Sequence, residues 1–64
     1  MLDLDKLKKL RNKRGLSQQQ AAEAAGIGGR QRWNDMESGR RGIGLETLDK
    51  IAQALGVKAK DLLK

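Results

Sequence analysis

The chain has 64 residues, a formal net charge of +6, and neither cysteine nor histidine. Without cysteine it has no disulfide framework, and without histidine it lacks the commonest general base and metal ligand. No apolar run approaches the ~20 residues that a membrane-spanning helix needs. We therefore expect one small domain over residues 1–64, without a signal peptide. We do not expect an enzyme, a metal- or cofactor-dependent protein, or a membrane protein.

The positive charge is unevenly distributed along the sequence. Residues 1–14 carry six basic and two acidic side chains, residues 15–29 carry only Glu23, and residues 30–41 carry four arginines against two acids. Basic charge therefore surrounds the central segment, as it does in proteins that bind polyanions. Many small helical proteins are also basic, so charge alone does not identify a nucleic-acid binder.

A first helix is predicted from Asp3, which can cap it, to Gly15, which can end it. Its apolar stripe is spaced at helical intervals and consists of Leu4, Leu7 and Leu10. Arg11 falls inside this stripe. Either its stem lies on apolar surface while its head reaches water, or it is a buried charge with a partner.

The next segment has the pattern of two short helices joined by a tight turn. Ser17 and Gln20 have the spacing of a capping box, and three alanines (Ala21, Ala22 and Ala25) fall on one face of the helix that follows. Gly26 can end that helix in the left-handed conformation, and Ile27 can fill the space between the two helices. A further helix over about 29–38 then completes a helix-turn-helix.

The helix over 29–38 has one apolar face and one polar face. Trp33 and Met36 are predicted to face inward, with Glu37 at the edge of that face. The polar face and its flanks hold Arg30, Gln31, Arg32, Asn34, Asp35 and Ser38. Trp33 could instead stack on a base, but its spacing with Met36 favours the core.

The remainder of the chain predicts a loop, a long helix and a short one. The loop over 39–44 holds Arg40 and Arg41 between glycines, where backbone N–H groups are expected to be free for an anion. Leu45 begins a periodic apolar run that Gly56 ends, and Leu62 and Leu63 lie in a short fifth helix. We therefore expect a compact all-α fold of five helices whose core includes Leu7, Ala22, Ile27, Trp33, Met36, Leu48, Ile51 and Leu55.

Several short patterns, in order, resemble the Cro and phage-repressor type of helix-turn-helix, often called the Xre family. They run from Leu7 to Leu63 and include Arg11, Gly15-Leu16-Ser17-Gln18, Glu37-Ser38-Gly39-Arg40-Arg41, Leu45-Glu46-Thr47-Leu48 and Ala54-Leu55-Gly56-Val57. The chain departs from the family pattern at Gly28-Gly29, where it has one extra turn residue and lacks the usual Ser/Thr cap.

The resemblance implies a lambda-repressor-like fold that binds double-stranded DNA as a small transcriptional repressor or regulator. The residues at the family's base-reading positions are Arg30, Gln31, Asn34 and Asp35. Phosphate contacts are expected from Ser17, Gln18, Arg32, Arg40 and Arg41. The resemblance also implies a structural salt bridge between Arg11 and Glu37. We expect a weak homodimer, or a dimer formed on DNA. The expected location is the cytoplasm of a bacterium, a phage-infected cell or a host of a mobile element. No small-molecule ligand is expected.

Four alternatives stay open from the sequence alone. The polar face of the third helix could be ordinary solvated surface, or the fold could serve as a protein-interaction or antitoxin-type dimerisation module. Double-stranded RNA is a weaker rival, because a recognition helix fits the major groove of B-DNA better than that of A-form RNA. Asp35 could read a base, or it could only orient Arg30 or Arg32 through a salt bridge.

Overall fold

The computed structural model describes residues 2–63, and within that range the chain is helical, with a single isolated β-bridge and no strand. Its elements, in order, are α1 (Leu4–Lys13), α2 (Gln18–Ala25), α3 (Arg30–Glu37), α4 (Leu45–Leu55) and the 3₁₀ turn η1 (Ala59–Leu62). The predicted all-α fold is confirmed. The fifth helix is shorter than an α-helix and consists of one 3₁₀ turn.

The helix ends use the side chains that the sequence provides for them. The Asp3 carboxylate accepts from the backbone N–H of Lys6 at the start of α1. At the start of α2 both bonds of the capping box are present: the Gln20 N–H donates to Ser17 Oγ over 3.1 Å, and the Ser17 N–H donates to Gln20 Oε1 over 2.9 Å. Gly26 ends α2 with φ +67°, in the left-handed region that glycine adopts without strain.

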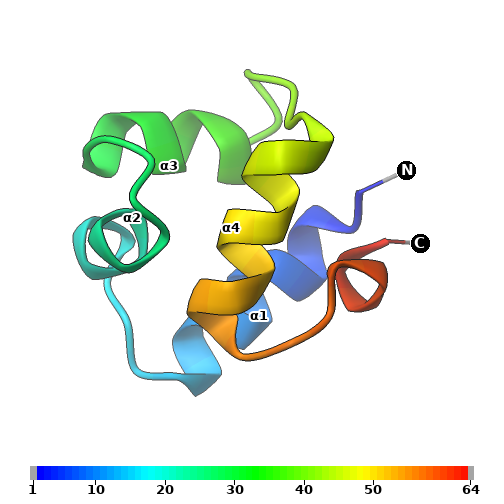
Figure 1. Ribbon diagram of the computed structural model, residues 1–64. Helices are drawn as coiled ribbons and strands as arrows, with labels where there is room; N and C mark the ends of the chain where they lie inside the picture. The colour runs from blue at the N-terminus through cyan, green and yellow to red at the C-terminus, as the bar shows by residue number, and fades with distance from the viewer. Residues whose placement is uncertain (1, 64) are drawn as a thin grey trace.

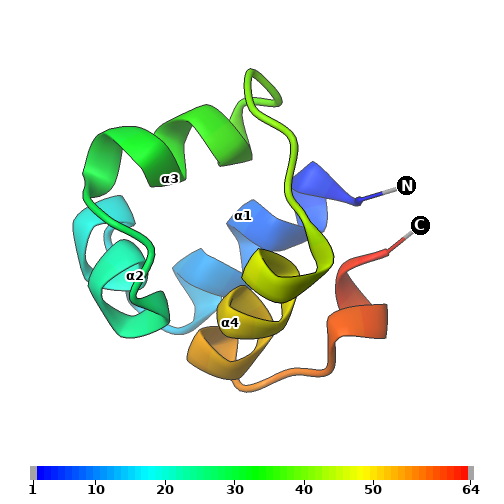
Figure 2. The ribbon, with the colours of Figure 1, turned by 45° about the horizontal axis from the view of Figure 1, so that its top comes forward.

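The α2 and α3 helices lie next to each other and are joined by a short turn, while α4 runs beside them and leads to η1 (Figures 1 and 2). The turn is anchored by the Ile27 N–H, which donates to the carbonyl of Ala22 over 3.1 Å. The Ile27 side chain is buried at 4% exposure. This single apolar residue among glycines therefore fills the space between the two helices, as predicted.

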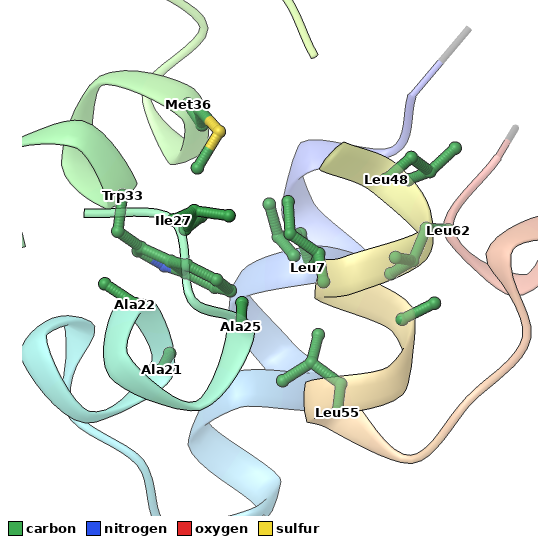
Figure 3. Close-up of a cluster of buried hydrophobic side chains, with 12 residues drawn as sticks. Leu7, Ala21, Ala22, Ala25, Ile27, Trp33, Met36, Leu48, Leu55 and Leu62 are labelled. Carbon is green, nitrogen blue, oxygen red and sulfur yellow. The ribbon is translucent and has the colours of Figure 1, made fainter. Parts of the chain in front are cut away.

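The core lies where α1, α2, α3 and α4 meet. Figure 3 shows Trp33 extending its ring from α3 toward the interior, near α2 and Ile27. Trp33 is fully buried, so it is a core residue and not an exposed stacking platform. All eight predicted core residues are buried, and they are joined by Ala21, Ala25, Ala52 and Leu62. The small alanines of α2 let α3 approach it closely.

Two leucines expected at the inward positions of their helices are exposed. Leu45 is 83% exposed, although it continues the apolar period of α4. It is the first residue of that helix, which projects past the core at this end, and Leu48 one turn later is the first α4 leucine to be buried. Leu63 is 45% exposed because it follows η1, whose own Leu62 takes the buried position.

The two ends of the described chain are joined by backbone contacts. The Asp3 N–H donates to the carbonyl of Leu62 over 2.7 Å, and Leu2 and Leu63 form the isolated antiparallel bridge. In both views these ends lie together on the side of the molecule away from α2 (Figures 1 and 2). The start of α1 and η1 are thus held together without a longer sheet.

Candidate nucleic-acid interface

The α3 helix buries one face and exposes the other. Trp33 and Met36 are at most 1% exposed, whereas Arg30, Gln31 and Arg32 are all exposed. On the same outer side Asn34 and Asp35 are half-buried. The Gly29 N-cap makes no side-chain hydrogen bond, so the first turn of α3 lacks the cap that Ser or Thr would provide.

The carboxylate of Glu37, the last residue of α3, is held by Arg11 of α1. Arg11 Nε donates to Glu37 Oε2 over 2.9 Å, and Arg11 Nη2 donates to Glu37 Oε1 over 3.1 Å. The two side chains are 10% and 6% exposed. Because the third guanidinium nitrogen, Nη1, donates to the carbonyl of Leu16 over 2.8 Å, Arg11 also fixes the turn before α2. The structure therefore brings together the two charges that were expected to pair.

Glu37 accepts two further hydrogen bonds that the sequence did not predict. Trp33 donates its indole N–H to Oε2 over 2.7 Å, and Gln18 Nε2 lies 3.4 Å from Oε1. Burial alone would raise the pKa of Glu37. The hydrogen bonds from Arg11, Trp33 and Gln18, together with the positive charge of Arg11, outweigh burial and lower that pKa below its usual value of 4.5. Glu37 is therefore held as a charged acceptor linking α1, α2 and α3.

Gln18 is turned toward this network rather than toward solvent. Its amide nitrogen donates to Asn34 Oδ1 over 3.1 Å as well as to Glu37. In this conformation the Gln18 amide nitrogen is bonded within the domain, and its phosphate contact stays a prediction. The same bond uses one lone pair of the Asn34 carbonyl oxygen and leaves the Asn34 amide nitrogen without a partner among residues 2–63. The sequence could not show this, because α2 and α3 had to be placed before the two side chains could meet.

A polar hollow of about 350 Å³ lies over this network between α1, α2 and α3. It is lined by Lys8, Arg11, Gln18, Asn34, Glu37 and Ser38. Lys8 and Ser38 were not among the predicted site residues. Lys8 precedes Arg11 by three residues and so shares its side of α1, which is the signal that could have identified it.

The Arg40–Arg41 segment is tied to the end of α3 by its backbone. The N–H groups of Arg40 and Arg41 donate to the carbonyl of Asp35 over 2.9 and 3.2 Å. Ser38 Oγ donates to the same carbonyl over 3.2 Å, and Gly39 takes φ +84° to make the turn. The expectation that these backbone N–H groups are free to bind an anion is therefore wrong. Arg40 and Arg41 are exposed, so their guanidinium groups remain available.

On the outer face of α3, Gln31 and Asp35 are joined by a hydrogen bond. Gln31 Nε2 donates to Asp35 Oδ1 over 3.1 Å, one helical turn away. Neither Arg30 nor Arg32 forms a salt bridge with Asp35, since Arg11–Glu37 is the only ion pair among residues 2–63. The Arg32 stem instead lies near Gly28 in the preceding turn. In this conformation Asp35 does not orient either arginine.

Two short helices joined by a tight turn, the second with a buried face and an exposed polar face, define a helix-turn-helix domain. The family model of the helix-turn-helix domain matches residues 5–63, and the chain belongs to this family. The match is consistent with the Cro and phage-repressor type that the sequence resembles, and the family indicates DNA binding. A comparison with curated proteins finds no match.

None of the helices in the described part of the chain combines the length and the apolar character needed to cross a membrane. Among residues 2–63, no group of three or more His, Cys, Asp or Glu side chains is placed to hold a metal ion.

Proposed function

We propose that the protein is a sequence-specific regulator that binds double-stranded DNA and acts as a transcriptional repressor. One observation carries this proposal: the exposed side of α3 bears Arg30, Gln31 and Asp35, while Trp33 and Met36 lock its other side into the core. Because an α-helix fits the major groove of B-DNA, these side chains would meet the edges of bases there.

The groups surrounding α3 supply phosphate contacts on three sides. Arg40 and Arg41 extend from a loop whose backbone is bonded to Asp35, so their position follows that of α3. Gln18 of α2 and Lys8 of α1 line the hollow beside α3, and Ser17 caps α2 next to Gln18. Such contacts place the recognition helix in register, and base contacts supply specificity.

In this proposal Arg30 and Gln31 contact bases, with Asp35 and Asn34 one turn further along. Arg30 begins the helix and lies where side chains of a recognition helix reach base edges. Arginine suits the O6 and N7 atoms of guanine. Arg32 leans toward the turn and is assigned to phosphate. A regulator of this kind would act in the cytoplasm of a bacterium or a phage-infected cell, where its DNA is accessible.

A single recognition helix reads only a few base pairs, so we propose that two copies bind a near-palindromic site. The expected self-contact is Val57 with the start of η1. Val57 borders a hollow whose apolar part is formed by Leu10 and Leu55, and whose edge carries Lys13 and Arg14. Because the two basic residues of one copy would approach those of the other, the contact is weak without DNA, and DNA phosphates would offset the repulsion.

The experiment is a measurement of affinity against salt concentration, first with random duplex DNA and then with a duplex selected from a random pool. DNA binding predicts a steep linear fall of log affinity with log salt, because phosphate neutralisation releases counterions. A sequence-specific regulator also binds the selected duplex at least about 10³-fold more tightly than random DNA. No binding to either duplex would overturn the proposal and favour the protein-interaction module. Equal affinity for both duplexes would leave a non-specific DNA-binding protein.

A further inference from the structure

The hydrogen bond between Gln31 and Asp35 changes what the outer face of α3 can recognise. Both side chains lie on the side opposite the buried Trp33, one turn apart, and Gln31 Nε2 lies 3.1 Å from Asp35 Oδ1. The second carboxylate oxygen of Asp35, Oδ2, has no hydrogen-bond partner among residues 2–63. Gln31 therefore holds one carboxylate oxygen of Asp35, and the other oxygen is free to accept a hydrogen bond from a base.

An ionised carboxylate is the one base-reading group here that can only accept hydrogen bonds. Guanine and thymine present acceptors to the major groove, and a carboxylate is repelled by them. Adenine presents its N6 amino group, but the N7 acceptor lies beside it. Cytosine presents its N4 amino group and no acceptor, which makes it the best match for Asp35 Oδ2.

Resting on the proposed function, we infer that Asp35 is a specificity-determining residue that selects the N4 amino group of a cytosine, and that Gln31 is a positioning residue for its carboxylate. The bond to Asp35 uses one of the two amide hydrogens of Gln31. Its carbonyl oxygen and its other amide hydrogen remain available to a base. The negative charge of Asp35 faces a polyanion, and the basic side chains of Arg30, Arg32, Arg40 and Arg41 around it offset that repulsion.

The chain provides a matched control for the Gln31–Asp35 pair. On α2, Gln19 Nε2 donates to Glu23 Oε2 over 3.3 Å with the same spacing of one turn, and both residues are exposed. Gln19→Met removes an equivalent bond without touching α3. Both variants lose an exposed Gln amide, but only Gln31→Met loses the hydrogen bond to Asp35. Comparing their DNA binding therefore isolates the effect of that bond.

The test begins with selection of bound sequences from a random duplex pool. The parent should require a cytosine at one position of each half-site, and Asp35→Ala, which removes the acceptor, should lose that requirement. The selected site is then remade with a pyrimidine that lacks the N4 amino group in place of this cytosine. Its affinity for the parent should fall about 5- to 150-fold, the range of a good base contact. Asp35→Ala should show little change between the two duplexes.

Gln31→Met should lie between the parent and Asp35→Ala in this comparison, and Gln19→Met should behave as the parent. Thermal unfolding of each variant checks that it folds. The inference is overturned if Asp35→Ala keeps the cytosine requirement, or if the N4 amino group contributes as much to the affinity of Asp35→Ala as to that of the parent. The positioning role fails if Gln31→Met matches Gln19→Met. Absence of all DNA binding overturns the proposed function as well, whereas binding with normal salt dependence but no cytosine preference overturns this inference alone.

Discussion

Trp33 donates its indole N–H to Glu37 over 2.7 Å, on the same carboxylate oxygen that Arg11 Nε reaches over 2.9 Å. Trp33, which packs α3 into the core, is thus hydrogen-bonded to Glu37, which joins α3 to α1. Since Gln18 of α2 also donates to this carboxylate, the orientation of α3 depends on one acidic side chain. Changes at Glu37 or its partners should therefore affect both the stability of the domain and its DNA binding.

Replacing Arg11 by Met should destabilise the domain severely. The change leaves the Glu37 carboxylate buried with its main counter-charge removed, and breaking a buried pair in this way costs about 3–5 kcal/mol. Urea unfolding followed by fluorescence of Trp33, the only Trp, measures the effect. Lys9→Met, an exposed change on the same helix, should cost little. Arg11→Met melting within a few degrees of the parent would show that the pair is not structural.

A second variant distinguishes lost charge pairing from lost packing. Combining Arg11→Met with Glu37→Gln removes the unpaired charge but keeps an acceptor for the Trp33 N–H. The double variant should therefore recover part of the stability lost by Arg11→Met alone. If the two changes are simply additive, the two side chains do not interact as the structure shows.

Stability should also depend on pH through Glu37. Its folded-state pKa lies below the usual 4.5, so the folded state favours the charged form more strongly than the unfolded state does. The resulting stabilisation is fully present above about pH 4.5 and is lost as pH falls through the lowered pKa. Glu37→Gln should show a smaller fall in unfolding free energy on acidification. Parallel profiles for the parent and Glu37→Gln would contradict the assignment.

Replacing an arginine assigned to bases and replacing one assigned to phosphates should change DNA affinity in different ways. Arg30→Ala should cost about 1–3 kcal/mol on the preferred site and little on random DNA, because Arg30 is assigned to base reading. Arg40→Ala or Arg41→Ala should weaken binding to both duplexes alike and reduce the salt slope by about one. Lys50→Ala, a change of charge at an exposed position of α4, serves as the control. If Arg30→Ala and Gln31→Ala bind every sequence as the parent does, the readers lie elsewhere on the domain.

Stoichiometry should distinguish a dimer on DNA from a monomer. We expect a monomer in solution at low concentration, and two copies on a duplex whose half-sites lie about one helical turn, ~34 Å, apart. Inserting five base pairs between the half-sites turns them to opposite sides of the helix and should abolish cooperative binding. Analytical ultracentrifugation and titration of the two duplexes measure these effects. Tight one-to-one binding to a single half-site would contradict the dimer.

Local sequence signals predicted the helix boundaries well, since each depends on a few neighbouring residues. The Ser17–Gln20 capping box and the left-handed Gly26 are both present, and the spacing of Trp33 with Met36 placed the indole correctly in the core. Leu45 shows the limit of periodicity: a helical period gives the side of a helix but not how far the core extends along it.

The contacts of the polar side chains were harder to predict. Gln18 is used inside the domain by Asn34 and Glu37, which lie on another helix. Its role depends on the distance between α2 and α3, which no short pattern encodes. The backbone of Arg40 and Arg41 folds onto the Asp35 carbonyl for a similar reason, because the loop closes back on the helix it follows.

The backbone contacts that join Leu2 and Asp3 to Leu62 and Leu63 have a practical consequence. A fluorophore, an affinity tag or a surface tether attached at either end would leave from the same side of the domain, away from α2 (Figure 1). A short peptide linking Leu2 to Leu63 would close this domain into a ring with little distortion of the folded state. Because a ring has fewer unfolded conformations than a linear chain, the cyclic form should unfold at a higher temperature while leaving α3 free.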